Sequence, residues 1–141
     1  MPEIIIGPRR SSPFDVELTV FEEDTWLVLS AGNFARETRH PTEELVDDMA
    51  SFSPHALGEL IVKGNRACAI VHDLDRTPSC DDESVCHALD ALFAHCQAAG
   101  LRAIAIQPLG CVYAPGRITD FIDRLRAHPR ADDLDRIWVV T

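Results

Sequence analysis

Apolar and polar residues along the chain follow two periods, which predict strands and helices in alternation. Residues 15–20 alternate strictly, a pattern typical of a strand with one face in solvent. Continuous apolar runs favour strands buried on both faces, and three such runs are expected to be neighbouring central strands: Trp26–Leu29, Ala69–Val71 and Ile104–Ile106. Three further strands are expected at 3–6, 58–63 and 136–140, the first of them at a sheet edge. The acidic triplet 22–24, between two apolar segments, reads as a turn.

Apolar residues at helical spacing predict three helices. The clearest covers 84–99, where Asp81 and Asp82 precede the first turn and Gly100 follows the last one. Another begins after Pro41, because proline lacks only an N–H that a first helical turn does not use. The third carries the apolar residues of 118–125 on one face. Strands first, then helix and strand in alternation, predict an α/β fold with a mixed sheet.

Composition narrows the classes of function. With 141 residues, the chain is expected to be one domain, 1–141. Its net charge of −10 argues against nucleic acid as a partner, but backbone amides could still bind a small anion. The longest apolar runs are far below the roughly 18 residues that a membrane span needs. No secretory signal begins the sequence and the five cysteines are odd in number, so we expect reduced thiols in the cytoplasm.

The helix expected at 84–99 also bears on metal binding. Its spacing places Cys86 and Cys96 together with Leu89 on one face, as small core residues. His87 and His95 point away from that face. A zinc site needs ligands that converge on one point, and these diverge. We therefore expect no metal, and no other cofactor is indicated.

Four stretches, taken in order, resemble segments of a known family. Residues 27–33 (LVLSAGN) resemble an apolar strand that ends in Asn-Ala-Ala-Asn, and 58–72 resemble a Gly-Glu segment followed by a strand ending in Val-Ile-His. Residues 84–108 are similar to a helix, a glycine and a strand of the Ser-Ile-Ala-Phe-Pro type. Residues 110–114 (GCVYA) are similar to a Gly-Ile-Tyr-Gly loop. Over about 16–140, this order and spacing resemble the macro domain family.

The resemblance implies a three-layer α/β/α sandwich with a central mixed sheet. It also implies a cleft for ADP-ribose or a related phosphorylated nucleotide at the ends of the strands, where open α/β sheets generally bind ligands. Two features depart from the family. Residues 34–40 contain no glycine where the family has a glycine-rich phosphate loop, and no adenine-reading aspartate is evident near Thr19.

These departures favour a small-ligand binding module without catalysis. Two alternatives stay open. One is an ADP-ribosyl hydrolase, which needs a positioned acid or base, although its relatives carry that residue in the loop that differs here. The other is a protein-interaction module with a degenerate pocket, including a homo-oligomer.

Seven residues are candidates for ligand contacts. The resemblance places Asn33 at the distal ribose, although asparagine also caps turns well. The backbone of Gly110, Cys111, Val112, Tyr113 and Ala114 would hold phosphates, with the tyrosine ring on a base or ribose; the alternative is a plain connection between strand and helix. Arg36 lies where the first glycine loop should be and could supply positive charge, or pair with nearby acids on a solvated face.

Cys111 is the one cysteine in a candidate site loop. As a nucleophile it would need a histidine partner in space. His72 ends a neighbouring strand in the family pattern, but a histidine there is more commonly a satisfied core residue. We therefore assign no catalytic residue from the sequence.

Overall fold

The computed structural model describes residues 2–10, 12–29 and 54–141. Asn33, Arg36 and the helix expected after Pro41 lie outside this part of the chain. The strands are β1 Glu3–Gly7, β2 Leu18–Asp24, β3 Leu60–Lys63, β4 Arg66–His72, β5 Ala103–Ile106 and β6 Arg136–Val140. The helices are α2 Asp82–Ala99, α3 Ile118–Ala127 and the short 3-10 helix η2 Ala131–Asp133.

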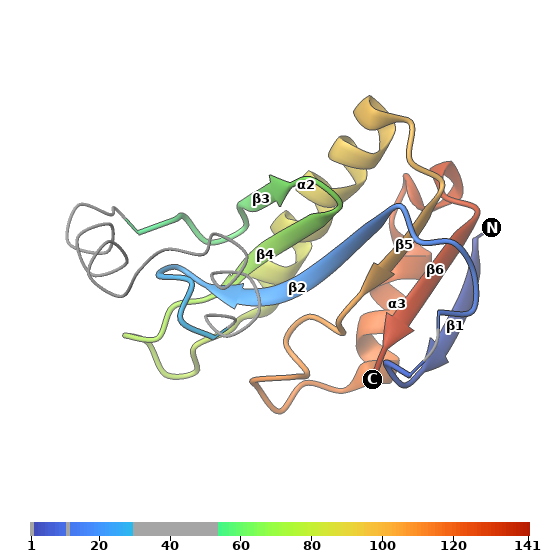
Figure 1. Ribbon diagram of the computed structural model, residues 1–141. Helices are drawn as coiled ribbons and strands as arrows, with labels where there is room; N and C mark the ends of the chain where they lie inside the picture. The colour runs from blue at the N-terminus through green and yellow to red at the C-terminus, as the bar shows by residue number, and fades with distance from the viewer. Residues whose placement is uncertain (1, 11, 30–53) are drawn as a thin grey trace.

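The strands form one mixed six-stranded sheet in the order β1-β6-β5-β2-β4-β3 (Figure 1). Only the β3–β4 pair is antiparallel; β1, β6, β5, β2 and β4 run parallel to one another. The edge position of β1 and the central positions of β4 and β5 are as the sequence predicts. Because β2, β4 and β5 are parallel neighbours, their carboxyl ends and the loops that follow lie at the same edge of the sheet.

The third expected central strand was assigned to the wrong residues. Trp26–Leu29 is a turn, and the strand between β4 and β5 is Leu18–Asp24, which includes the acidic triplet expected to be a turn. The reason lies in the Asp24 side chain, whose oxygens accept hydrogen bonds from the backbone N–H groups of Trp26, Val28 and Leu29. These bonds replace the ladder bonds that a strand over these residues would need.

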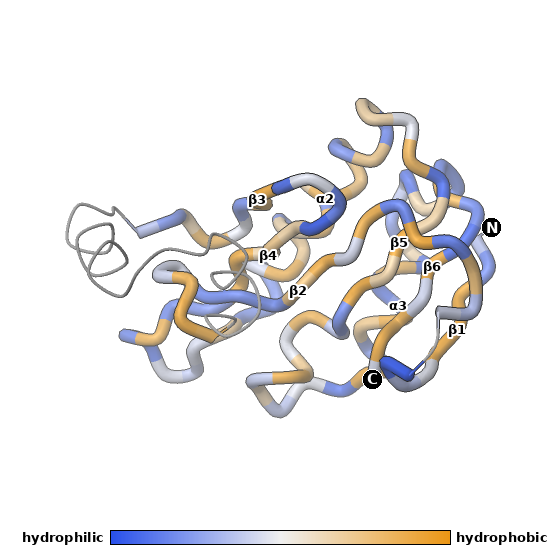
Figure 2. Tube along the Cα trace, in the orientation of Figure 1, coloured by the Kyte–Doolittle hydropathy of each residue, from blue (hydrophilic) through white to orange (hydrophobic). Residues whose placement is uncertain are grey.

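Both described helices cover the same face of the sheet (Figure 1). Alternate side chains of four parallel strands meet them in one core, whose members include Leu18, Val20, Ala69, Val71, Leu89, Phe93, Ile104, Leu125 and Ile137. Figure 2 shows β2 changing from hydrophobic to hydrophilic toward its carboxyl end. The fold is thus the predicted α/β class with a mixed sheet, and the described helices supply one of its outer layers.

The ends of α2 follow the sequence signals. The Asp81 side chain accepts a hydrogen bond from the Ser84 N–H, and Gly100 ends the helix in the left-handed region at φ 69°. On the predicted buried face, Leu89 and Cys96 are buried, but the assignment of Cys86 was wrong: it is exposed, and the buried stripe passes through Val85 instead. In the described ranges, no helix is long and apolar enough to cross a bilayer.

Candidate functional site

The carboxyl end of β2 carries three consecutive acidic residues that are fully buried. Glu22, Glu23 and Asp24 each have 0% exposed surface. Asp and Glu are almost never fully buried unless their charges are paired or hydrogen-bonded. The groups that pair with these three side chains therefore determine the local structure at this end of the sheet.

Glu22 binds the loop that follows β5. One carboxylate oxygen accepts the N–H of Gly110, and the other accepts the N–H of Tyr113 at 2.8 Å. The backbone N–H of Glu22 itself donates to Oε1 of Gln107, at 2.8 Å, so β2 is also tied to the residue that follows β5. The loop that the sequence marks as an anion cradle thus already has a carboxylate against two of its amides.

His72, the last residue of β4, is the third partner of Glu22. Its Nε2 lies 3.1 Å from Oε2 of Glu22, and both side chains are fully buried. The contact is not aligned as a hydrogen bond, and within the described residues Nε2 has no other partner. Nδ1 lies 2.8 Å from the Ser79 hydroxyl, and the ring meets the edge of Tyr113 with 6.4 Å between centroids.

These contacts bear on the idea of a Cys111 nucleophile. The polar contacts of His72 go to Ser79 and Glu22, and the Cys111 thiol points to the carbonyl of Leu109, 3.8 Å away. Burial raises the pKa of Cys111, and the charge of Glu22 raises it further. A thiol with a raised pKa is mostly protonated at neutral pH, which makes it a weak nucleophile.

Asp24 organises the turn on the other side of the site. Its oxygens accept N–H groups of Trp26 at 2.7 Å, of Val28 at 2.8 Å and of Leu29 at 2.8 Å. Leu27, inside this turn, has φ 60°, a left-handed conformation that costs a non-glycine residue roughly 1–2 kcal/mol. The Tyr113 hydroxyl donates to the carbonyl of Leu29 at 3.3 Å, so this turn and the loop after β5 are in contact.

The loop itself brings five of the seven candidate residues together. Gly110 has φ 79°, and a Cβ on Gly116 would lie 2.4 Å from the Gly110 carbonyl oxygen, so both positions need glycine. The N–H groups of Val112 and Ala114 make no hydrogen bond with any described part of the chain. The Tyr113 side chain is 46% exposed. The loop therefore has two amides engaged by Glu22 and two that no described residue engages.

A pocket of about 340 Å³ lies on the side of this loop that faces the starts of α2 and α3. Its lining includes Cys80, Gly110 and Ala114 with acidic and basic side chains of both helices, among them Asp82 and Arg124, which are 2.7 Å apart. Burial raises the pKa of the Cys80 thiol to about 12, with the Glu22 charge as the next cause. The volume of this pocket falls in the range of small-molecule sites.

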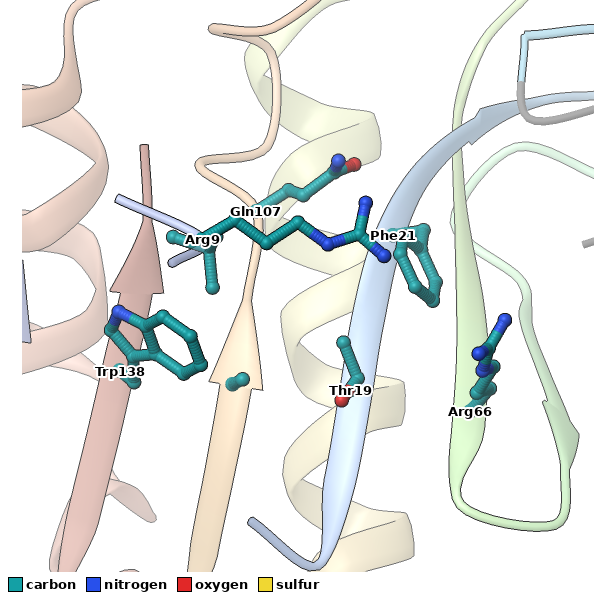
Figure 3. Close-up of a pocket in the computed structure, with 8 residues that line it drawn as sticks. Arg9, Thr19, Phe21, Arg66, Gln107 and Trp138 are labelled. Atoms are coloured by element: carbon teal, nitrogen blue, oxygen red, sulfur yellow. The ribbon is translucent and has the colours of Figure 1, made fainter. Parts of the chain in front are cut away.

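A smaller pocket of about 130 Å³ lies on the sheet face opposite the described helices (Figure 3). Arg9 reaches across toward Phe21, and the guanidinium carbons of Arg9 and Arg66 lie 5.8 and 5.9 Å from its ring centroid. Cation–π contacts of this kind explain why two arginines gather here. The volume is below the roughly 300 Å³ at which small-molecule sites begin.

Sequence reasoning missed Glu22 and Asp24, because a run of acids between apolar segments reads as a turn. The available signal was indirect: the alternation of Leu18, Val20 and their neighbours runs directly into the acids without a glycine or proline to stop it. Asn33 and Arg36 lie outside the described residues, so their expected places beside the loop stay predictions.

Comparison with known proteins gives a result for structure and none for sequence. No family model and no curated protein matches the sequence. The macrodomain of Mycobacterium tuberculosis DarG superposes with a TM-score of 0.72 at 14% identity, covering 100% of both chains. The macrodomain of Thermus aquaticus DarG gives 0.67 at 19% identity, covering 100% of this chain and 98% of that one.

A third structure carries a ligand. A variant of the Oceanobacillus iheyensis macrodomain, solved with ADPR, gives a TM-score of 0.65 at 12% identity and covers 96% of this chain and 82% of that one. At such identities the likeness concerns the fold. This confirms the family resemblance at that level, and the chain has the macrodomain fold.

Proposed function

We propose that this chain is a binding module for a phosphorylated nucleotide of the ADP-ribose type, without catalysis. The observation that carries the proposal is the loop after β5: at the carboxyl ends of parallel strands, the N–H groups of Val112 and Ala114 have no partner among the described residues and lie beside the half-exposed Tyr113 ring. Loops at this edge are the usual ligand sites of open α/β sheets. The macrodomain fold, seen with ADPR in one neighbour, supports the same ligand class.

In this proposal the phosphates lie against the Val112 and Ala114 amides, and Tyr113 packs on a ribose or a base. Asn33 and Arg36 would contribute from the segment after the Asp24 turn. The negative charge of Glu22 beneath the loop disfavours an anion above it. We therefore expect weak binding, with Kd in the micromolar range or poorer, about −8 kcal/mol or less favourable.

The site chemistry of the described residues supports binding over hydrolysis. Glu22 has both carboxylate oxygens engaged by backbone amides, so it is poorly placed to act as a general base. The pKa of Cys111 is raised by burial. We propose the cytoplasm as the location of this chain, where the five thiols of the sequence would stay reduced.

Isothermal titration calorimetry with ADP-ribose, ADP and AMP tests the proposal. Tyr113→Ala should weaken ADP-ribose binding about tenfold or more, since stacking on an aromatic ring contributes roughly 1–3 kcal/mol per base. Tyr113→Phe is the matched control: it keeps the ring and loses only the hydrogen bond to Leu29. Absence of heat with the wild-type protein, or equal affinities of wild type and Tyr113→Ala, would contradict the proposal.

A protein-interaction module is the second candidate, favoured by a specific surface. Five of the exposed large apolar side chains lie on loops that follow β2, β4 and β5: Trp26, Val28, Leu74, Val112 and Tyr113. Clusters of this kind mark interaction sites. Analytical ultracentrifugation over a concentration series tests a homo-oligomer: a mass that rises with concentration in the wild type and stays monomeric in Val112→Ser would favour this candidate, and a monomer throughout would speak against it.

A further inference from the structure

The geometry points to Glu22 as a built-in anion: its carboxylate occupies the inner anion site of the 110–114 loop and excludes phosphate from it. This inference rests on the proposed function only in placing the ligand at the same loop. It assigns Glu22 the role of a specificity-determining residue. Phosphate contacts should then be confined to the outer amides, Val112 and Ala114.

The first argument is the convergence of two amides on one carboxylate. The N–H groups of Gly110 and Tyr113, three residues apart, each bond to a different oxygen of Glu22. Such convergence requires the loop to fold back on itself, which the left-handed Gly110 permits. A concave set of N–H groups is an anion site whichever molecule supplies the anion. Here the chain supplies it from β2.

The second argument is that the surroundings hold the carboxylate in place. His72 Nε2 faces it at 3.1 Å without another partner among the described residues, and the Ser79 hydroxyl fixes the opposite side of the ring. After burial, the charge of Glu22 is the next cause that raises the pKa of the Cys80 and Cys111 thiols. Since Glu22 is fully buried, water does not compete for its oxygens.

The third argument comes from a contrast within the same loop. Gly110 and Tyr113 are bonded inward, whereas Val112 and Ala114 have no partner in the described chain. A phosphate that approached the inner amides would have to displace a buried carboxylate of the same sign. It meets no such competitor at the outer amides.

Chemical rescue tests this assignment. Glu22→Ala removes the charge and leaves a space that a small anion can fill, whereas Glu22→Gln removes the charge and keeps the volume. Sodium formate and sodium phosphate, compared with sodium chloride at equal ionic strength, should raise the Tm of Glu22→Ala saturably, by about 3–5 °C. They should raise the Tm of the wild type and of Glu22→Gln by clearly less, because the inner site stays filled there and only the general salt effect of the anion and the outer amides remain.

Glu17 offers a control at the other end of β2. One of its carboxylate oxygens accepts the N–H groups of Arg102 and Ala103 at 2.8 and 2.9 Å, but Glu17 is exposed. Water replaces this carboxylate when it is removed, so Glu17→Ala should show no anion-specific rise in Tm. A folded Glu22→Ala protein that formate and phosphate fail to stabilise more than chloride would overturn the inference.

If Glu22→Ala does not fold, the wild-type protein still decides. In amide NMR, Gly110 and Tyr113 should exchange slowly with solvent and keep their chemical shifts in phosphate, whereas Val112 and Ala114 should exchange fast. Fast exchange of Gly110 and Tyr113, or a phosphate-induced shift of both, would overturn the inference. Failure of the proposed function looks different: no heat with ADP-ribose in the wild type, with formate rescue of Glu22→Ala intact.

Discussion

The two ends of β2 use the same chemistry in opposite environments. At its start, the exposed Glu17 accepts two N–H groups of the segment that leads into β5. At its end, the buried Glu22 accepts two N–H groups of the loop that leaves β5. In water a lost carboxylate is replaced by solvent, but in a buried site its partners stay unsatisfied. The comparison therefore separates an exposed carboxylate, which water can replace, from a buried one, whose loss leaves the loop after β5 without its hydrogen-bond acceptor.

Removing each carboxylate should give the largest contrast. Glu22→Ala leaves the amides of Gly110 and Tyr113 without their acceptor and opens a space beside the buried ring of His72, so we expect a loss of about 3 kcal/mol in the free energy of unfolding. Glu17→Ala should lose less than about 1 kcal/mol. Urea denaturation followed by circular dichroism measures both, and equal losses would show that burial does not set the difference.

The two glycines that flank β5 extend the comparison, with a smaller expected difference in stability. Gly100 precedes the strand at φ 69° with nothing within 4 Å of an added Cβ, and Gly110 follows it at φ 79° with Cys80 Sγ at 3.3 Å. Each replacement by alanine should cost about 1 kcal/mol for the left-handed backbone. Gly110→Ala should cost about 1 kcal/mol more, because the thiol must move. Denaturation midpoints that coincide for the two variants would contradict this.

Much of this architecture could be predicted from the sequence, and the failures have one physical origin. The residue ranges of β4, β5 and β6, and those of α2 and α3, follow approximately from apolar periodicity. Residues that pack against one core recur at the spacing of a strand or of a helix. The strand expected at 15–20 overlaps the first half of β2, but its acidic second half was missed because periodicity treats an acid as a solvent-facing residue. Glu22 is buried because backbone N–H groups distant in sequence donate to its carboxylate, and Asp24 because N–H groups of the turn that follows it do so. Apolar periodicity shows neither kind of partner.

The candidate site, like the fold, has features that the sequence predicts and features that it does not. The loop 110–114 could be found from Tyr113 and from Gly110 and Gly116, the two positions whose local conformation requires glycine. That Glu22 already binds two of its amides could not, since the contact joins residues 88 and 91 positions apart. His72 was noted at the end of its strand, but its partners turned out to be Ser79 and Glu22.

The reactivity of two cysteine thiols tests the charges at the two ends of β2, Glu22 and Glu17, separately. Burial and then Glu22 raise the pKa of Cys80 to about 12, and burial and then Glu17 raise that of Cys96 to about 11. Glu22→Gln should lower the pKa of Cys80, and Glu17→Gln that of Cys96, while burial keeps both above 9. Of these two cysteines, only the matching one should be labelled faster by iodoacetamide at pH 9, between about two- and tenfold by mass spectrometry. Cys111, whose pKa the Glu22 charge also raises, should be labelled faster in Glu22→Gln as well. Acceleration at both Cys80 and Cys96 in either variant would indicate loosened packing rather than lost charge.

The smallest expected effect concerns α2, the helix that begins at the site and ends at the opposite edge. Asp81 caps its first turn, and the hydrogen bonds from Ser84 lower the pKa of Asp81. A pKa lowered by folding means that the carboxylate stabilises the fold above the unfolded value of 3.8 and that this contribution is lost as the pH falls through the folded pKa. Because Asp81 is mostly exposed, Asp81→Ala should cost only about 0.5–1 kcal/mol at pH 7. Asp81→Asn keeps a capping oxygen without the charge, so it should lose less at pH 7 and should match the wild type more closely in acid. Urea midpoints at pH 7 and pH 3 decide this: a difference between wild type and Asp81→Asn that grows toward acid would reverse the sign expected here.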